Sequence, residues 1–566
     1  MQPLCHDEES YALLQFKESL VINESASSDP SAYPKVASWK VHGESGDCCS
    51  WDGVECDGDS GHVIGLHLSS SCLYGSIDSN SSLFHLVQLR RLNLADNDFN
   101  NSEIPYEIRN LSRLFDLDLS LSVFSGVIPS SLGNLTKLNY LDLSYNFFSG
   151  KIPPSLVNLF QLTYLSLSRN NFTSGTLHWL GNLTKLKYYV GLARTNSYGE
   201  IPSCLGNLTK LTGLNLYSNE LTGQIPSWIG NQTQLILLDL GVNKLHGPIP
   251  ESIFRLPNLE TLNLEQNLFS GTVEFGLLKS RSLVSFQISD NNMSVIGNHN
   301  DSAALPKIQI LGLAGCNLSG EFPSFLHGQN HLEFVELSGN KIEGHIPKWF
   351  MNLGTETLWY LNLRGNLLTG FEKSIDILPW NNLRYLKLSF NKLDGALPIP
   401  PLSTIIYVVS YNRLNGEIPP AICNLTSLVI LRLSNNNLSG KLPQCLGNIS
   451  NSASVLDLRN NSFSEILNIE QNKINDVFPS WMGILPNLRV LILRFNRLHG
   501  VIGKPKADFE FQRLQIVDLS GNCFLGKLPL EYLRNWSAMK TIYTERPLYM
   551  QVDASFHLPR YILKLH

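Results

Sequence analysis

One short pattern recurs along most of this chain and limits what it can fold into. The segment Leu138–Pro153 reads L-N-Y-L-D-L-S-Y-N-F-F-S-G-K-I-P, and its template, L-x-x-L-x-L-x-x-N-x-x-x-G-x-I-P, returns about every 24 residues. A fixed period of this length is typical of a solenoid, in which each turn buries its apolar face only against its neighbours. We therefore expect the 566 residues to form one long repeat domain between short ends.

The repeat predicts a leucine-rich-repeat α/β solenoid wound as a right-handed superhelix. In each turn the L-x-L core should form a short strand whose leucines are buried, while the x residues point outward onto a continuous, concave parallel sheet. The I-P half, as in Ile128-Pro129 and Ile225-Pro226, fixes an extended backbone. Short second strands and helical turns are expected on the convex side, and about 20 turns fit between residues 63 and 530.

Two stretches break this period most clearly. Between residues 291 and 306 the Gly and Ile-Pro are lost, which predicts an irregular loop. Between Leu456 and Leu467, residues 456–467, two strand cores lie only 11 residues apart, although parallel neighbours need a crossover of about a dozen residues or more. We expect a distorted turn there, as though sequence had been lost between Ser464 and Ile466.

An asparagine stands five residues after the first paired leucine of most turns. Its amide should turn inward and must be hydrogen-bonded, and the nearest partners are backbone groups of adjacent turns. We therefore predict an asparagine ladder, in which Cys316 replaces the asparagine of one turn as a buried thiol. The ladder positions include Asn97, Asn146, Asn170, Asn219, Asn243, Asn267, Asn340, Asn391, Asn412 and Asn496.

Residues 1–62 differ from the repeats and are predicted to cap the solenoid. Asp7–Leu20 has helical apolar spacing, with acids in its first turn where the helix dipole favours them. Four of the 10 cysteines lie between Cys5 and Cys56, and this clustering predicts disulfides and an oxidising compartment. The cap should cover the apolar end of the first turn at Leu66 and Leu68.

Sequons of the N-x-S/T type favour a secreted, glycosylated protein. The charged fraction of 16% and the net charge of -5 argue against a nucleic-acid partner, which requires a clustered basic surface. The expected glycosylation sites include Asn23, Asn80, Asn110, Asn134, Asn171, Asn182, Asn207, Asn424, Asn448 and Asn535.

The two ends of the chain carry no targeting or anchoring signal. Met1 to Cys5 has no apolar signal-peptide core, and no run of about 18 apolar residues is present to span a membrane. The tail at residues 531–566 lacks the repeat pattern. We therefore expect a mature or truncated portion of an exported protein.

No catalytic constellation stands out in the sequence. Asp57 and Asp59 lack the further carboxylate that a calcium loop requires, so a solvated turn is favoured. Neither H-E-x-x-H, nor G-x-x-x-x-G-K-S/T, nor G-x-S-x-G occurs. The prediction is a protein that is not an enzyme and holds no metal or cofactor.

Binding is expected on the outward strand positions, because a rigid sheet presents them side by side. Aromatic residues and arginines are the usual anchors of interfaces, although each one singly is as well explained as framework or solvated surface. The later turns carry mostly positive charge, so we expect an acidic or polar peptide, or a carboxylate-bearing glycan, on the C-terminal half. The candidate residues are Tyr145, Arg169, Tyr189, Arg194, Tyr217, Glu265, Trp359, Arg364, Arg384, Lys387, Phe390, Arg432, Arg459 and Arg494.

The motifs resemble those of plant extracellular leucine-rich-repeat receptor-like proteins of the disease-resistance type. The resemblance is carried by Y-A-L-L-Q-F-K and C-C-S-W-D-G-V-E-C in the cap, by the N-L-T-x-L-x-x-L-D-L-S-x-N repeat, and by the late segments N-K-I-N-D-V-F-P-S-W and N-W-S-A-M-K. It implies disulfides Cys5–Cys48 and Cys49–Cys56. Cys423 and Cys445 could form a further bridge or be buried unpaired, and both readings stay open.

The resemblance also implies a biological setting. The family is anchored on the extracellular side of the plasma membrane, and its members engage adaptor and co-receptor kinases through their last repeats and membrane-proximal part. Residues 531–566 would begin the island region that follows the main repeat block in such proteins. Relative to that pattern the chain lacks both ends, which puts anchoring and kinase recruitment in question.

Two classes of function follow from this reading. The first is a receptor-like protein of plant defence that senses a peptide, protein or glycan elicitor on its concave surface. The alternative is a soluble inhibitor or decoy that binds a pathogen enzyme such as polygalacturonase, or a gene fragment without function. The sequence does not identify the ligand.

Overall fold

The computed structural model comprises two compact units, Met1–Lys307 and Ile308–His566, and each is described by itself. The structure describes residues 4–40, 47–297, 305–373, 377–443, 446, 454–463, 478, 482–483, 485, 487–505, 510–526, 528, 530–536 and 538. We call the two parts the N-terminal unit and the C-terminal unit.

A disulfide-bonded cap covers the first turn of the N-terminal unit. Helix α1 (Asp7–Glu18) buries Leu13 and Phe16 and has three acids in its first turn. The short helices η1 (Glu24–Ala26), η2 (Lys35–Ser38) and η3 (Cys48–Ser50) follow, and β1 (Leu20–Ile22) pairs antiparallel with β4 (Leu73–Gly75). β2 (Val54–Cys56) pairs antiparallel with the first repeat strand, β3 (Val63–His67). Leu66 and Leu68 are fully buried beneath this cap, as expected.

The predicted disulfides Cys5–Cys48 and Cys49–Cys56 are both present. Their cysteines come from the start of the cap, from η3 and from β2, so the bridges tie together segments that bury few aliphatic side chains. Such cross-links stabilise a small cap mainly by restricting its unfolded chain.

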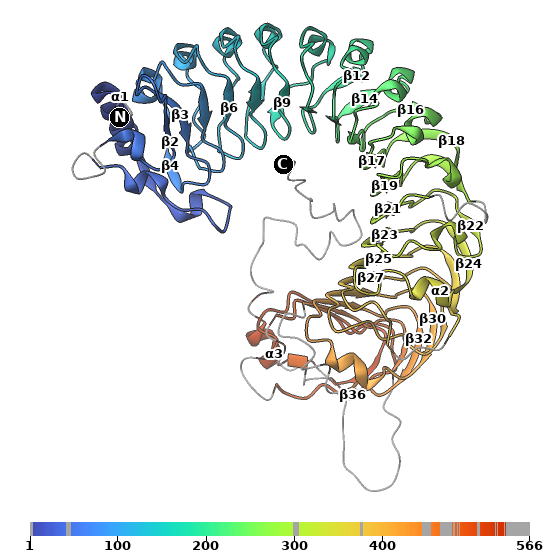
Figure 1. The fold of residues 1–566 in the computed structure, drawn as a ribbon. Helices are drawn as coiled ribbons and strands as arrows, with labels where there is room; N and C mark the ends of the chain where they lie inside the picture. The colour runs from blue at the N-terminus through green and yellow to red at the C-terminus, as the bar shows by residue number, and fades with distance from the viewer. Residues whose placement is uncertain are drawn as a thin grey trace. The chain divides into compact units, whose positions relative to one another are not determined.

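A parallel sheet forms one side of the N-terminal unit. Its central leucines pair in register from turn to turn, as Leu66 with Leu92 and Leu92 with Leu117, and Figure 1 shows the strands on the inner side of this unit with the short helices outside. After β3 the strands are β5 (Arg91–Asn93), β6 (Asp116–Asp118), β7 (Tyr140–Asp142), β9 (Tyr164–Ser166), β11 (Tyr189–Gly191), β13 (Gly213–Asn215), β15 (Leu237–Asp239), β17 (Thr261–Asn263) and β19 (Ser285–Gln287).

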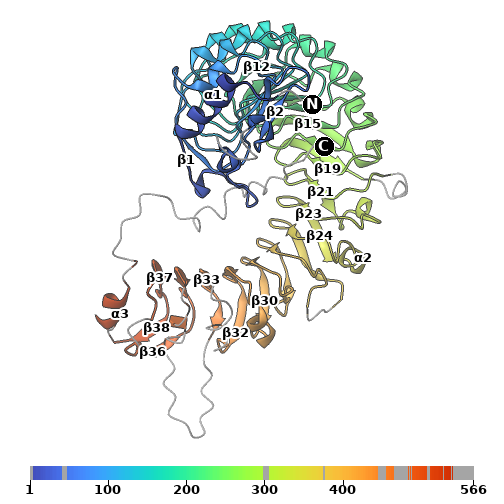
Figure 2. The same ribbon diagram turned by 60° about the vertical axis from the view of Figure 1, so that its left-hand side comes forward.

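The C-terminal unit repeats this design. Figure 2 shows β33 and β37 on one side of the unit and the second strands β32, β36 and β38 on the other. The ladder consists of β21 (Ile310–Gly312), β23 (Phe334–Glu336), β25 (Tyr360–Asn362), β27 (Tyr385–Lys387), β29 (Ile406–Val408), β31 (Ile430–Arg432), β33 (Val455–Asp457), β35 (Val490–Ile492) and β37 (Ile516–Asp518).

One predicted strand position in this ladder is wrong. β33 pairs directly with β35, so Leu456 faces Leu491, and the strand expected at Leu467 is not its neighbour. The physical reason is the crossover length: 11 residues are too few to return a parallel strand, although the local letters I-L-N-I-E-Q-N imitate a repeat core. The distorted turn expected from Ser464 onward lies outside the described residues.

Second strands and short helices complete each turn. In the N-terminal unit the second strands are β8 (Ser149–Gly150), β10 (Asn171–Phe172), β12 (Tyr198–Glu200), β14 (Glu220–Thr222), β16 (His246–Gly247), β18 (Leu268–Glu274) and β20 (Asn292–Ile296). In the C-terminal unit they are β22 (Ser319–Gly320), β24 (Lys341–Ile346), β26 (Leu367–Phe371), β28 (Asp394–Gly395), β30 (Arg413–Gly416), β32 (Asn437–Gly440), β34 (Ser462–Phe463), β36 (His499–Val501) and β38 (Cys523–Leu525).

The helical turns begin directly after the I-P motif. Pro129, for example, is extended, with φ of -69° and ψ of 142°, and η6 follows it. The helices of the N-terminal unit are η4 (Ser82–His85), η5 (Tyr106–Asn110), η6 (Ser130–Asn134), η7 (Pro154–Asn158), η8 (His178–Asn182), η9 (Ser203–Asn207), η10 (Ser227–Asn231), η11 (Glu251–Arg255) and η12 (Phe275–Leu277). Those of the C-terminal unit are η14 (Ser324–Leu326), α2 (Lys348–Met351), η15 (Pro420–Asn424) and α3 (Leu530–Asn535).

The loop expected at residues 291–306 is partly a strand. β20 pairs with β18 over five residues, from Ser270 with Asn292 to Glu274 with Ile296. Met293 and Val295 are buried, and this alternation of buried and outward residues is the strand signal that the missing I-P motif obscured. Residues 298–304 of the expected loop lie outside the described residues.

The asparagine ladder is present. The Asn97 amide donates to Leu68 O at 2.8 Å, and its oxygen accepts from Leu73 N at 3.0 Å, so one side chain joins two turns. Asn340 repeats this arrangement with Leu313 O and Leu318 N. Cys316 is fully buried at the equivalent position.

Helix α3 covers the last described turn. It follows Pro529 in the sequence as the other helices follow their I-P motifs, and the domain boundary expected at residue 531 stays a prediction. Tyr532 is buried and packs on Phe511 and Phe478, with ring centroids 6.1 and 5.6 Å away. No helix among the described residues is long and apolar enough to cross a membrane.

Candidate ligand-binding surface

Four positions of each repeat build the outward face of the strand ladder. In the turn L-N-Y-L-D-L-S-Y-N, Tyr140 and Asp142 flank the central leucine, and Ser144 and Tyr145 precede the ladder asparagine. The fourth position has a left-handed backbone in most turns, with φ of 56° at Tyr145. We call the face formed by these positions the strand surface of each unit.

Bulky side chains occupy this left-handed position in several turns, although glycine would be less strained there. Gly339 and Gly365 stand at it in two turns, whereas Phe390 and Tyr411 stand at it with φ of 56° and 58°. A non-glycine residue in this region costs about 1–2 kcal/mol. Strained residues that persist in a fold mark candidate functional positions.

The strand surface of the N-terminal unit brings predicted residues together in two groups. The Arg169 guanidinium lies 4.7 Å above the Tyr145 ring, a cation–π pair. In the second group, Arg194 and Glu265 both act on Tyr217: burial raises the pKa of Tyr217 to about 12, Glu265 adds to the shift, and Arg194 opposes it.

Tyr189 belongs to a stack of tyrosines that the sequence reasoning missed. The rings of Tyr140 and Tyr164 lie 4.2 Å apart, and those of Tyr164 and Tyr189 lie 5.3 Å apart. Gly191 and Gly213 make room for the last ring, because a Cβ at either position would come within 2.5 or 2.7 Å of it. The signal was available, since the three tyrosines share one register position of consecutive turns.

Two carboxylates of this surface are withdrawn from solvent, since Asp142 is buried and Asp239 is half-buried. Burial raises the pKa of Asp142 to about 7, and the neighbouring Asp118 adds to that shift. Burial also raises the pKa of Asp239 to about 8. Asp142 accepts a hydrogen bond from the Ser144 amide at 2.8 Å, so this aspartate of the L-D-L motif belongs to the framework.

An aromatic and cationic group dominates the strand surface of the C-terminal unit. The Phe390 ring stacks on the Tyr411 ring at 4.3 Å, and the Arg364 guanidinium lies 4.9 Å from the Phe390 ring centre. Nearby, the Lys387 ammonium lies 5.5 Å from the centre of the Tyr360 ring. Tyr411 was not among the sequence candidates, although it occupies the same left-handed position as Phe390 one turn later.

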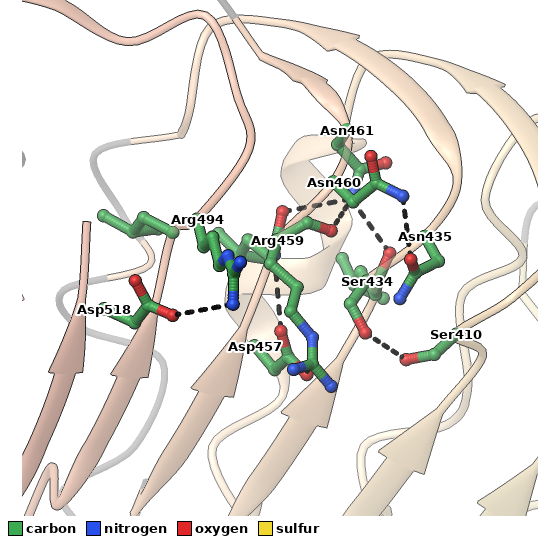
Figure 3. Close-up of polar contacts among 12 residues, drawn as sticks. Ser410, Ser434, Asn435, Asp457, Arg459, Asn460, Asn461, Arg494 and Asp518 are labelled. Atoms are coloured by element: carbon green, nitrogen blue, oxygen red, sulfur yellow. Dashed lines mark hydrogen bonds and ion pairs between the residues drawn. The ribbon is translucent and has the colours of Figure 1, made fainter. Parts of the chain in front are cut away.

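The predicted arginines farther along this unit are partly neutralised (Figure 3). Arg459 lies 3.4 Å from the Asp457 carboxylate, and Arg494 lies 4.0 Å from Asp518 while its guanidinium covers the Phe495 ring at 4.3 Å. Burial raises the pKa of Asp457, and the positive charges of Arg459 and Arg432 oppose that shift. The positive charge expected on this surface is therefore balanced in part by carboxylates of the same unit, and Asp457 lies within electrostatic reach of both Arg459 and Arg432.

Two further candidates lie at the edge of this surface. Trp359 and Arg384 each precede a strand, and the backbone N–H of Arg384 donates to Trp359 O at 2.9 Å. The Trp359 indole packs near Phe334 and Tyr385, with centroids 5.7 and 5.9 Å away. Its Nε1 is buried and has no hydrogen-bond partner among the described residues.

The predicted glycosylation sites lie away from the strand surface. Asn110, Asn134, Asn182, Asn207 and Asn424 each end one of the short helices. These five side chains and those of Asn23, Asn80 and Asn171 are exposed, whereas Asn448 and the Asn535 side chain lie outside the described residues. Glycosylation itself stays a prediction.

The remaining cysteine and metal expectations are resolved in part. Cys423 is disulfide-bonded, and its expected partner Cys445 lies outside the described residues. The sulfurs of Cys5, Cys48 and Cys49 lie within 4.8 Å of one another, but all three belong to disulfides and offer no thiolate to a metal. Asp57 accepts from Ser60 N at 3.1 Å, which makes the D-G-D-S segment a turn.

The fold, the cap and the strand surface define a leucine-rich-repeat protein, and comparison with known families agrees. Residues 6–57 match the leucine-rich-repeat N-terminal domain, residues 209–269 match a leucine-rich-repeat model, and further single repeats match at 137–159, 161–183, 331–353 and 427–449. None of these family models describes an enzyme.

Relatives among characterised proteins narrow the class. The chain is 41% identical to Receptor-like protein 49 of Arabidopsis thaliana, over 88% of this chain and 68% of that protein. It is 36% identical to Receptor like protein 27, over 90% and 65%, and 37% identical to Receptor-like protein 47, of which it spans 36%. The chain belongs to the plant leucine-rich-repeat receptor-like protein family.

Solved structures with the same fold include receptor ectodomains. The Arabidopsis receptor kinase HAESA, in complex with an N-terminally extended IDA peptide hormone, superposes with a TM-score of 0.70 at 29% identity, over 93% of this chain and 87% of that one. The GASSHO1/SCHENGEN3 ectodomain, in complex with CASPARIAN STRIP INTEGRITY FACTOR 2, gives 0.68 at 28% identity, over 93% and 63%.

Proposed function

We propose that this chain is the ligand-recognition part of a receptor-like protein in plant defence signalling, and that a peptide or protein elicitor binds along the strand surface of the C-terminal unit. The observation that carries the proposal is the Arg364, Phe390 and Tyr411 group. Two exposed aromatic rings are held there in a strained backbone conformation, although neighbouring turns show that glycine satisfies the fold.

The chemistry of this group suits an acidic or polar peptide. Aromatic rings and arginine are the side chains that most often anchor a partner, and Lys387 and Arg432 extend the positive charge along the same ladder. Arg459 and Arg494 have carboxylate partners within the chain, so they contribute less free charge to a ligand. A peptide lying across consecutive turns would meet the aromatic stack first and these cations beside it.

Relatives support the ligand class and a signalling partner. The solved complex of HAESA with IDA pairs a receptor ectodomain of this fold with a peptide hormone, and HAESA has also been solved with IDA and the co-receptor SERK1. We extend this to the present chain: a peptide ligand on the strand surface and a co-receptor kinase, with adaptor kinases as further partners, in a receptor-like protein at the extracellular side of the plasma membrane.

The test is charge reversal at three positions of the C-terminal strand surface. The variant Arg364→Glu, Lys387→Glu, Arg432→Glu should lose binding to acidic peptides found by screening the secreted protein, with a fall of at least about tenfold. Calorimetry or surface plasmon resonance measures the affinity.

A matched triple variant controls for total charge. Lys341→Glu, Lys348→Glu, Arg413→Glu changes three exposed cations of the same unit that lie on β24, α2 and β30, and it should bind as the parent protein does. Unchanged affinity of the first variant would refute the proposal. Tight inhibition of a secreted microbial polygalacturonase, with no peptide bound, would favour the soluble-inhibitor alternative.

A further inference from the structure

A cleft with basic walls opens beside the first strands of the N-terminal unit. It has a volume of about 340 Å³ and is lined by Arg90, Arg91, Arg113, Phe115 and Lys137. These residues come from three consecutive turns that are joined through their backbones, since Phe115 N donates to Arg90 O at 2.7 Å. The cleft is therefore built by equivalent positions of consecutive repeats: Arg91 lies on β5, and the other lining residues lie in the turns that lead into the ladder strands.

Two of the four cationic side chains of this cleft form ion pairs with carboxylates of the cap, and the other two do not. Arg91 lies 2.9 Å from Glu55 and Arg90 lies 3.4 Å from Asp57, so the cap holds these two side chains in place. Arg113 and Lys137 are exposed, and no ion pair joins either of them to another described residue. Their charges are left available to a ligand from outside the chain.

The positive charge continues along one register position of the repeat. The residue that precedes the first leucine of each turn is a cation in four turns and neutral in the others from Gln88 to Asn258, with no acid among them. In chain order these residues are Gln88, Arg113, Lys137, Gln161, Lys185, Lys210, Gln234 and Asn258. We call this row the basic edge.

The basic edge suits a linear polyanion. Successive turns lie about 4.8 Å apart, the distance between hydrogen-bonded strands, so its cations recur at that interval or a multiple of it. A 1,4-linked uronic-acid chain carries one carboxylate on every ring, so its anionic groups follow one another along the chain as the cations follow one another along the edge.

The floor of the cleft also suits a sugar. Phe115 is 46% exposed and offers an apolar face to the C–H side of a pyranose ring. The next residues in its row are Asn139 and Thr163, which are half-buried polar groups joined by a hydrogen bond of 2.7 Å. They place amide and hydroxyl groups where ring hydroxyls would follow.

We propose that the cleft and the basic edge form a second binding site, which takes a linear carboxylate-bearing polysaccharide of the polyuronate type. Arg113 and Lys137 bind successive carboxylates, Phe115 packs against a ring between them, and Lys185 and Lys210 extend the contact along the chain. The site lies on the N-terminal unit, and its ligand differs from the peptide proposed for the C-terminal strand surface, so either can fail without the other.

The experiment measures binding of a short 1,4-linked oligogalacturonate to the full chain secreted from plant cells. The parent protein should bind it, more weakly as salt screens the charges, and should not bind the methyl-esterified oligomer. The variant Arg113→Glu, Lys137→Glu should bind about tenfold more weakly or worse, because two attractions become repulsions. Arg255→Glu, which alters an exposed cation on η11, should change nothing.

Three outcomes would overturn the proposal. The first is no measurable binding of the oligogalacturonate by the parent protein. The second is equal binding by the parent and the Arg113→Glu, Lys137→Glu variant. The third is preference for an oligoglutamate of similar length over the oligogalacturonate, which would assign the cleft to an acidic protein partner. The far-ultraviolet circular dichroism of each variant verifies that it is folded.

Discussion

Phe390 combines strain, exposure and partners in a single residue. Its φ is 56° and its side chain is 44% exposed, while the ring touches Tyr411 and the Arg364 guanidinium. Gly365 occupies the equivalent position one turn earlier, so the fold does not require a side chain there. A recognition role for the ring accounts for both its presence and its strain.

Replacing Phe390 with glycine should separate recognition from stability. The change relieves about 1–2 kcal/mol of left-handed strain and removes about 0.5–1.5 kcal/mol of ring stacking, so the thermal midpoint should move little. Peptide binding should fall at least about tenfold. Calorimetry measures both quantities on the same sample.

The control for this variant is Leu388→Ala, two residues earlier. Leu388 is fully buried, and truncating it should destabilise the protein by about 2–5 kcal/mol. If Phe390→Gly destabilised the protein as much as Leu388→Ala does, the Phe390 ring would serve packing, and the proposed recognition role would be wrong.

The asparagine ladder joins one turn to the next at the level of the repeat element. The Asn340 amide donates to Leu313 O at 2.8 Å and to Leu337 O at 3.0 Å, and its oxygen accepts from Leu318 N at 3.0 Å. Other turns meet part of this need with smaller groups, as when the Thr195 hydroxyl donates to Leu192 O at 2.8 Å. The buried backbone N–H and C=O groups at this position need hydrogen-bond partners, and one asparagine side chain supplies most of those partners at once.

Substitutions at Asn340 should follow the number of buried groups they leave unpaired. Asn340→Leu keeps the branched shape of the side chain but leaves several backbone groups without partners, each costing about 1–3 kcal/mol, so it should destabilise the C-terminal unit strongly. Asn340→Thr should cost less, because its hydroxyl can donate as that of Thr195 does. Hydrogen exchange at the Leu318 amide measures the effect locally, and equal protection in the two variants would contradict the argument.

The sequence predicted the elements wherever the repeat period held. Leucine spacing gave the strand centres from Leu66 to Leu456 with their neighbours, because burial on one side of a strand leaves little freedom of register. It failed at Leu467, where a local imitation of the core could not satisfy the crossover length, and at Asn292–Ile296, where a strand formed without the I-P motif.

The sequence predicted which residues point outward on the strand surface, but it did not predict which of them contact one another. Outward positions of single repeats identified Arg364 and Phe390, yet the stack of Phe390 on Tyr411 joins two turns and needs the three-dimensional register. The basic cleft was missed for the same reason, because Arg113 and Lys137 look like ordinary solvated residues until consecutive turns place them side by side.

Asp142 and Asp239 should give the N-terminal unit a pH-dependent stability. The pKa of Asp142 is raised to about 7 and that of Asp239 to about 8, in both cases mainly by burial. Asp142 faces Asp118 and Tyr164, and Asp239 faces Glu265. A raised pKa means that the folded state holds protons that the unfolded chain has lost, so the free energy of unfolding falls as the pH rises through this window.

The whole molecule should therefore be more stable in mildly acidic than in neutral solution. Between about pH 5 and pH 7 each of these two carboxyls contributes a slope of up to about 1.4 kcal/mol per pH unit, so the thermal midpoint of the N-terminal unit should drop over that range. The double variant Asp142→Asn, Asp239→Asn keeps neutral side chains at both positions and should flatten this dependence, whereas Glu251→Gln, an exposed carboxyl on η11, should leave it intact. Differential scanning calorimetry at matched ionic strength decides the matter: a midpoint that rises toward pH 7 in the parent protein, or a slope unaltered in the double variant, would show that these carboxylates are not protonated in the folded chain.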